Sequence, residues 1–200
     1  MTATGLWDGL LGPLLGRTKL KKPDMDRIFA LATAEPSLAA AELGPGPAAA
    51  VCLRPVEGGA FAEVDAELER LVQLAANSED FHSQARVERD ELGYTWIVFR
   101  DARLEEQVSL AHLVASSLQE KGYGEQLLAA LFRMTRTQQE DADGCYLVYN
   151  YKRGAFYPFI PRGERTRDNA AEFRTASALG EMLPMEADIT RWFPLWDAPL

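Results

Sequence analysis

The chain has 200 residues, of which 47% are hydrophobic and 26% are charged, and its net charge is −9. This composition is that of one globular domain and excludes a disordered chain. The acidic excess argues against nucleic acid as a partner. No apolar run approaches the roughly 20 residues of a transmembrane helix, and Met1 to Gly16 do not resemble a signal peptide. We therefore expect a cytoplasmic protein.

The first 22 residues differ from the rest of the chain. Their four basic residues oppose only Asp8, so they carry +3 and the remainder carries −12. Hydrophobic residues precede the basic ones, and the segment combines Trp7, Leu10, Leu11, Leu14, Leu15, Arg17, Lys19, Lys21 and Lys22. This pattern is typical of an anchor on an anionic membrane surface, but an arm packed on its own domain is also consistent with it. We predict an arm over 1–22 and a single domain over 23–200.

Short helices are expected over 23–31 and 37–43. The second should end at Gly44-Pro45-Gly46-Pro47, because glycine and proline interrupt regular structure, and a strand should follow over 48–54. The clearest helical periodicity spans 61–75, where hydrophobic residues recur every three or four positions. Its acidic residues are predicted to face solvent: Glu63, Asp65, Glu67 and Glu69.

Strands are predicted over 86–91 and 94–100, around a turn at Leu92-Gly93, and both faces of the second strand are apolar. A helix over 104–118 follows. Residues 126–134 suit a helix or a strand, and we favour a strand because Gly122 and Gly124 interrupt the preceding helix. Strands over 145–151 and 155–160 come next, with Pro158 restricting the latter to an edge or a bulge. A helix over 169–182 completes an α+β two-layer domain with an antiparallel sheet covered by helices.

Catalytic signatures are missing from the chain. It contains no GxxxxGK[ST], GxGxxG, HExxH or GxSxG pattern, so we predict no enzymatic activity, cofactor or metal site. Its two histidines, His82 and His112, offer little to a metal site. Cys52 and Cys145 lie in apolar runs without CxxC spacing and are predicted to be buried free thiols.

Aromatic and basic residues alternate between residues 149 and 167. Because such side chains anchor many protein interfaces, the stretch is a candidate for partner binding. A structural hairpin, or stacking on single-stranded nucleic acid, would use the same residues. The candidates are Tyr151, Lys152, Arg153, Phe156, Tyr157, Arg165 and Arg167. Trp192 and Trp196 of the C-terminal RWFPLWDAPL either cover a core edge or form a docking motif.

A different function, small-ligand binding or a cryptic enzymatic activity, would need a pocket between the sheet and the helices. Arg54, Glu57 and the turn at 152–154 are its candidates. A deep polar pocket that holds Arg54 and Arg153 together would favour it.

From residue 14 to the end, six segments resemble the family of PspA-associated proteins PspAB. They are LLGRTKLKKPDMDRIFAL, VCLRPVEGGAFAEV, LGYTWIVFRD, YNYKRGAFYPFIP, RDNAAEF and RWFPLWDAP. The resemblance implies an accessory protein of PspA, the coiled-coil protein of a membrane-stress response, with an HtpX-type membrane metalloprotease as a further partner. It implies no catalytic residues. The order of elements is also similar to YbjN-like and type III secretion-chaperone-like domains, which bind protein segments.

Overall fold

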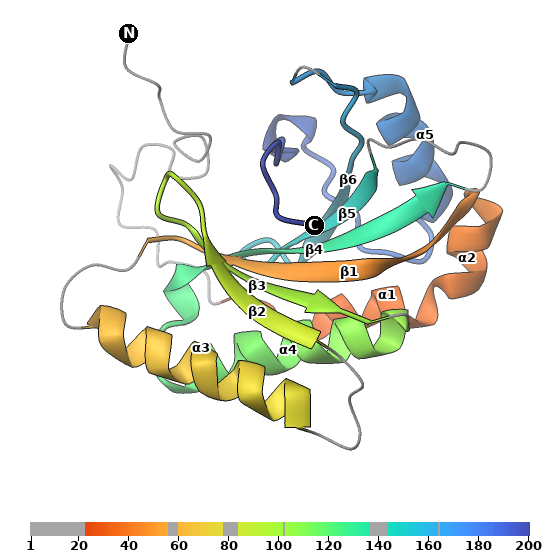
Figure 1. Ribbon diagram of the computed structural model, residues 1–200. Helices are drawn as coiled ribbons and strands as arrows, with labels where there is room; N and C mark the ends of the chain where they lie inside the picture. The colour runs from red at the N-terminus through yellow and green to blue at the C-terminus, as the bar shows by residue number, and fades with distance from the viewer. Residues whose placement is uncertain (1–22, 56–59, 78–83, 102, 137–143, 164) are drawn as a thin grey trace, which may run out of the picture.

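The computed structural model describes residues 23–55, 60–77, 84–101, 103–136, 144–163 and 165–200. Six antiparallel strands form one sheet in the order β2-β3-β1-β4-β5-β6 (Figure 1). The strands are β1 (Leu43–Leu53), β2 (Gln84–Arg89), β3 (Thr95–Arg100), β4 (Leu127–Arg136), β5 (Cys145–Asn150) and β6 (Ala155–Phe159). The helices are α1 (Ala30–Thr33), α2 (Glu35–Ala40), α3 (Ala60–Asn77), α4 (Leu104–Glu120) and α5 (Asn169–Leu179), with 3-10 turns η1 (Asp26–Phe29), η2 (Gly124–Gln126) and η3 (Ile189–Arg191).

The predicted α+β two-layer fold is confirmed. Residues 127–136 form a strand, as favoured over a helix, and β3 lies inside the sheet between β2 and β1. Pro158 lies on β6, which is an edge strand, so its missing N–H leaves no gap inside the sheet. These elements follow the local sequence pattern closely.

The prediction that Gly44 to Pro47 end regular structure is wrong. α2 ends earlier, at Ala40, and β1 begins at Leu43 and runs through the glycines and prolines. The strand accommodates them with a register shift against β4 between Pro45 and Ala49. Gly46 is required there, because a Cβ at this position would lie 2.5 Å from the carbonyl oxygen of Arg133.

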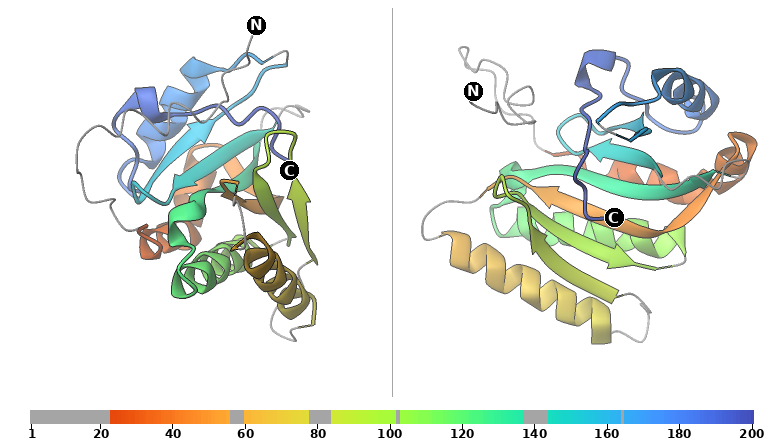
Figure 2. Two further views of the ribbon diagram at one scale, coloured as in Figure 1. Left: turned by 90° about the vertical axis from the view of Figure 1, so that its left-hand side faces the viewer. Right: turned by 45° about the horizontal axis from the view of Figure 1, so that its top comes forward.

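Helices cover one face of the sheet. Figure 2 shows α3 and α4 on that face, and their buried residues join those of the strands in one hydrophobic cluster. Val51 and Phe99 from the strands meet Leu68 of α3 and Val108 of α4 in it. Since these side chains are almost fully buried, this layer is the main core.

The C-terminal segment covers the other face. Trp192 and Leu195 are buried against Cys52, Val98 and the rest of a second hydrophobic cluster. In the two views of Figure 2 the C-terminal segment crosses the strands on the side opposite α3 and α4. The segment therefore completes the core, which resolves the two alternatives left open for it in favour of packing.

Hydrogen bonds from side chains to its carbonyl groups hold the C-terminal segment, and backbone hydrogen bonds cover the β6 edge. Arg86 Nη2 donates to the carbonyl oxygen of Pro199 at 3.1 Å, and the Tyr157 hydroxyl donates to that of Phe193 at 3.1 Å. On β6, the N–H of Phe156 donates to Pro184 O and its carbonyl accepts from Glu186 N. Residues 184–186 thus cover part of an edge that would otherwise pair with another chain.

Glu67 corrects the prediction that the acidic residues of the α3 helix all face solvent. Its side chain is 4% exposed and accepts hydrogen bonds from Arg70 and from the Ser117 hydroxyl of α4, with Lys121 Nζ at 3.2 Å. The hydrogen bonds from Arg70, followed by those from Ser117 and Lys121, outweigh burial and lower the pKa of Glu67 from 4.5 to about 2. The carboxylate therefore fastens α3 to α4.

Replacing Glu67 by Gln is expected to reduce the free energy of unfolding by about 2 kcal/mol at pH 7, because charge-assisted bonds to buried Glu67 are lost. A carboxyl whose pKa is lowered by folding stabilises the folded state at a pH above its unfolded pKa. The wild type should therefore lose this stabilisation as the pH falls from 4.5 towards about 2. Urea unfolding at pH 7 and pH ~3 measures both effects. Glu69→Gln, on the exposed side of α3, is the control; an equal loss there would contradict the assignment.

Replacing Trp192 by Ala is expected to cost about 3 kcal/mol of stability, because the indole is 8% exposed and its Nε1 donates to Glu186 O at 3.0 Å. Denaturant unfolding measures the loss. Leu92→Ala, at a side chain that is 53% exposed, should cost less than about 1 kcal/mol. Equal costs for both would show that the C-terminal segment does not stabilise the sheet.

Candidate partner-binding surface

The aromatic residues proposed from the sequence as interface candidates lie in the core. Tyr151 and Phe156 are fully buried on the helix side of the sheet, and Tyr157 is 2% exposed on the other side. Both tyrosine hydroxyls are bonded internally, since Tyr151 donates to the carbonyl oxygen of Ala111 and Tyr157 to that of Phe193. The interface prediction is wrong for these three residues, because strand pairing turns their rings into the two core layers.

The basic residues of the same stretch mostly serve the fold. Arg153 Nε donates to Glu186 at 2.7 Å, which ties the β5–β6 turn to the segment after α5. Arg165 pairs with Asp197 at 3.0 Å. The aromatic residues of 149–167 therefore form a structural hairpin, and a role of its basic residues in partner binding stays a prediction.

Arg167 is the most enclosed of these basic residues. It pairs with Glu172 at 2.8 Å and donates to the carbonyl oxygen of Trp192 at 2.7 Å. Burial raises the pKa of the Glu172 carboxyl, while Arg167 opposes that shift. Since these contacts join α5 to the C-terminal segment, Arg167 is a structural residue.

The residues named for a small-ligand pocket form different ion pairs. Arg54 lies 3.9 Å from Glu125, whereas Arg153 pairs with Glu186. Burial, followed by the positive charge of Arg54, lowers the pKa of Lys152. Neither hollow described below is lined by Arg54 or Arg153. Glu57 lies outside the described residues.

The two thiols are buried in the fold, and the described histidine lies beside a carboxylate at the surface. Cys52 and Cys145 are buried and free, as predicted, and burial raises the pKa of Cys145 to about 12, so it holds its proton. His112 Nε2 lies 3.3 Å from Asp26 on a partly exposed surface. Within the described part of the chain, no group of three potential ligands is placed to hold a metal ion. His82 and the arm residues Trp7 to Lys22 lie outside that part.

Large hydrophobic side chains are exposed around α5. Phe173 is 49% and Ile189 is 53% exposed, and both line a hollow of about 180 Å³ with Trp192 at one wall. The Phe173 and Trp192 rings lie 5.5 Å apart. Exposed aromatic and aliphatic groups beside a shallow hollow are typical of protein contacts. We call Phe173, Ile189 and Trp192 the Phe173 patch.

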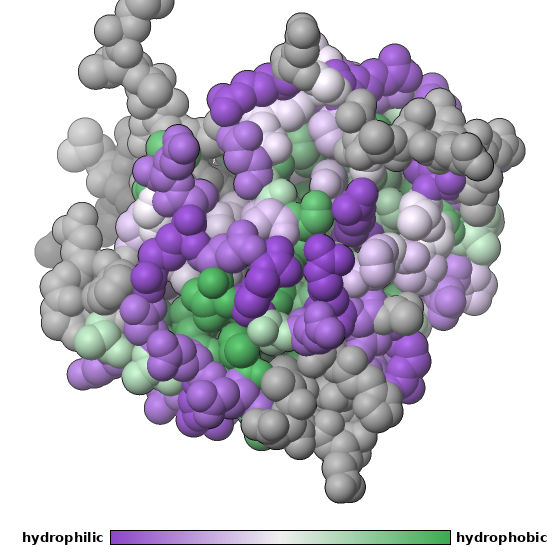
Figure 3. All heavy atoms as spheres, in the orientation of Figure 1, coloured by the Kyte–Doolittle hydropathy of each residue, from purple (hydrophilic) through white to green (hydrophobic). Residues whose placement is uncertain are grey.

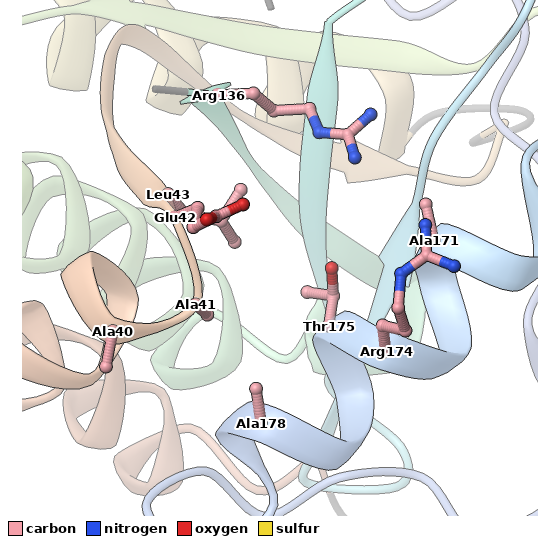
Figure 4. Close-up of a pocket in the computed structure, with 9 residues that line it drawn as sticks. All are labelled: Ala40, Ala41, Glu42, Leu43, Arg136, Ala171, Arg174, Thr175 and Ala178. Atoms are coloured by element: carbon pink, nitrogen blue, oxygen red, sulfur yellow. The ribbon is translucent and has the colours of Figure 1, made fainter. Parts of the chain in front are cut away.

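A larger hollow lies on the other side of α5. Its volume is about 440 Å³, and it is enclosed by α2, the start of β1, the end of β4 and α5. Figure 4 shows the guanidinium groups of Arg136 and Arg174, the Thr175 hydroxyl and the Glu42 carboxylate arranged around the same space. Small and apolar side chains form the rest of the wall: Ala40, Ala41, Leu43, Ala171 and Ala178. We call this hollow the α5 groove.

The strands and turns explain this placement. Arg136 is the last residue of β4, paired across the sheet with Leu43, the first residue of β1. Glu42 precedes β1 with a positive φ of 58°, which turns the chain sharply from α2 into the strand. Asp168 caps α5 by accepting from the N–H of Ala171, and that start places Arg174 beside the groove. Sequence reasoning missed both arginines, because each is an isolated charge without a local motif.

One face of the molecule (Figure 3) is mostly polar but carries a hydrophobic area. On the face in Figure 3, hydrophilic residues cover most of the described surface, and hydrophobic ones gather in the area where α3 and β2 lie in Figure 1. None of the helices that the structure describes has the length and hydrophobicity to cross a membrane. The two hollows that flank α5 are candidates for binding on the described part of the molecule.

The comparisons with known proteins agree with the resemblance seen in the sequence. No curated protein and no solved structure matches the chain, so its likeness to YbjN-like and secretion-chaperone-like domains stays a prediction. The family model PspAB, PspA associated protein B, matches residues 4–200, which is essentially the whole chain. The chain therefore belongs to the PspAB family.

Proposed function

We propose that this protein is a non-enzymatic accessory protein of the PspA membrane-stress response that binds PspA through the surface around α5. The observation that carries the proposal is the family, whose name states association with PspA. An HtpX-type metalloprotease is a second partner under the same proposal. The site of action is the cytoplasmic face of the membrane.

The location of the contact rests on exposure and chemistry. Phe173 and Ile189 leave about half of their side chains in solvent beside the Phe173 patch hollow. Burying such groups in a complex contributes roughly 25 cal/mol per Å² of apolar surface. Because Trp192 beneath them is packed into the fold, the patch is a firm platform on which little ordering entropy is lost.

The arm of residues 1–22 supplies membrane attachment in this proposal. Its charge of +3 opposes that of an anionic leaflet, and its tryptophan and leucines suit the interfacial region. The acidic body would be repelled by the same surface, so the arm is the part that makes contact.

Small-ligand binding is the second candidate, because the α5 groove has the size of a ligand pocket. Its volume of about 440 Å³ lies within the ~300–1,000 Å³ usual for such sites. A low-molecular-weight ligand that co-purifies from the native cell and disappears in Arg174→Ala would favour this candidate.

Replacing Phe173 by Asp is expected to weaken PspA binding about tenfold or more, because a charge would replace an exposed aromatic anchor. Titration of labelled PspA against the full chain measures the affinity. Leu92→Asp is the matched control, since that side chain is equally exposed in the β2–β3 turn. If the wild type does not bind PspA, the proposed partner is rejected. If Phe173→Asp binds PspA as tightly as the wild type does, this surface is rejected.

Replacing Lys19, Lys21 and Lys22 by Glu in the full chain is expected to abolish flotation with vesicles that contain anionic lipid, because the arm's attraction becomes repulsion. The wild type should float with anionic vesicles, and less so as salt increases. Vesicles of neutral lipid are the control. Equal flotation of the wild type and the triple variant would remove the arm from membrane attachment.

A further inference from the structure

We propose that the α5 groove binds carboxylate side chains of an acidic helical segment in the protein partner, with Arg136 and Arg174 as the receptors. The inference rests on the proposed function, and it assigns a chemical class of partner to one side of the α5 surface. Neither arginine was a candidate from the sequence.

Arg136 and Arg174 differ from most arginines of the fold. Most described arginines lie within 4.0 Å of a carboxylate, namely Arg27, Arg54, Arg70, Arg86, Arg89, Arg103, Arg153, Arg162, Arg165, Arg167 and Arg191. Arg100 and Arg133 make no such pair with a described residue, and neither do Arg136 and Arg174. Arg136 and Arg174 both face one hollow, although they belong to elements that are distant in the chain. A guanidinium that forms no ion pair with the described residues can pair with an external carboxylate.

The shape and lining of the groove suit a helical partner. The side chains along the groove at 40, 41, 171 and 178 are all alanines. Because they are small, a second helix can approach α5 and α2 closely. The Thr175 hydroxyl, on the same face of α5, adds a hydrogen-bonding group between the arginines. Apolar contact at the floor and charge at the rim are the usual division in a helix-in-groove interface.

The charges around the groove favour a helix over a small anion. Glu42 directs its carboxylate toward the same space as the two arginines, so a compact multivalent anion held between them would meet a like charge. Carboxylates carried on a helix can instead reach each guanidinium separately from outside. The negative charge of Glu42 thus selects against phosphate and tolerates separated carboxylates.

The experiment uses the full chain and a fluorescent Ala/Glu peptide of about 20 residues, long enough to form helix. Fluorescence anisotropy at low salt should show binding, and Arg136→Ala or Arg174→Ala should each weaken it about tenfold. Arg133→Ala is the matched control, because it removes the same charge from β4 at a position whose strand neighbour, Tyr146, belongs to the opposite core layer. An Ala/Gln peptide of the same length should not bind. The same variants are then tested against PspA, where both groove substitutions should weaken binding and Arg133→Ala should not.

Several results would overturn the inference. They are equal binding of the Ala/Gln peptide, unchanged affinity in the Arg136→Ala, Arg174→Ala double variant, and inorganic phosphate that displaces the peptide at micromolar concentration. Binding that appears only after Glu140, Asp141 and Asp143 are neutralised would identify the chain's own acidic residues as the occupant, and would also overturn it. If PspA binds the double variant as it binds the wild type, the groove is rejected while the proposed function stands. If PspA binds no form of the protein, the proposed function fails and the peptide titration still decides the groove.

Discussion

The fold depends on covering a sheet that is hydrophobic on both faces. β1 carries Ala49 and Val51 toward one core and Ala50 and Cys52 toward the other, and all four are fully buried. Helices alone cover one side. The second side would be exposed to water without Trp192 and Leu195, so the C-terminal segment is as much a part of the core as any helix.

The position of α5 follows from this double cover. Ala171 and Leu179 of the helix belong to the first core, whereas Ala176 packs against the second. Arg167 at its start joins Glu172 to the carbonyl oxygen of Trp192. A helix held from both layers is a rigid support, and a rigid support loses little entropy when a partner binds. The two hollows beside α5 are therefore consequences of the same packing that stabilises the sheet.

Internal pairing decides which charges are left for binding. The aromatic-basic hairpin is rich in arginines, but Arg153 and Arg167 are bonded to Glu186 and Glu172 within the fold. Arg136 and Arg174 have no described ion pair and face a hollow together. Composition along the chain thus did not single out Arg136 and Arg174, because it does not show which charges the fold pairs internally.

Local pattern was sufficient for the parts of the chain where one face of one element is buried. The three- and four-residue spacing of α3 and α4, the turn at Leu92-Gly93 and the proline of edge strand β6 each predict their structure without reference to distant residues. The six family segments likewise lie in the sequence itself, and they established membership of the PspAB family.

Only the tertiary structure decided what depends on partners far along the chain. β1 continues through Gly44 to Pro47 because β4 pairs with it, and Glu67 is buried because Ser117 and Lys121 of a different segment surround it. Arg136 and Arg174 share a groove because the end of β4 and the middle of α5 meet there. Periodicity determines which face of an element is buried; long-range pairing determines which polar groups meet and which remain for a partner.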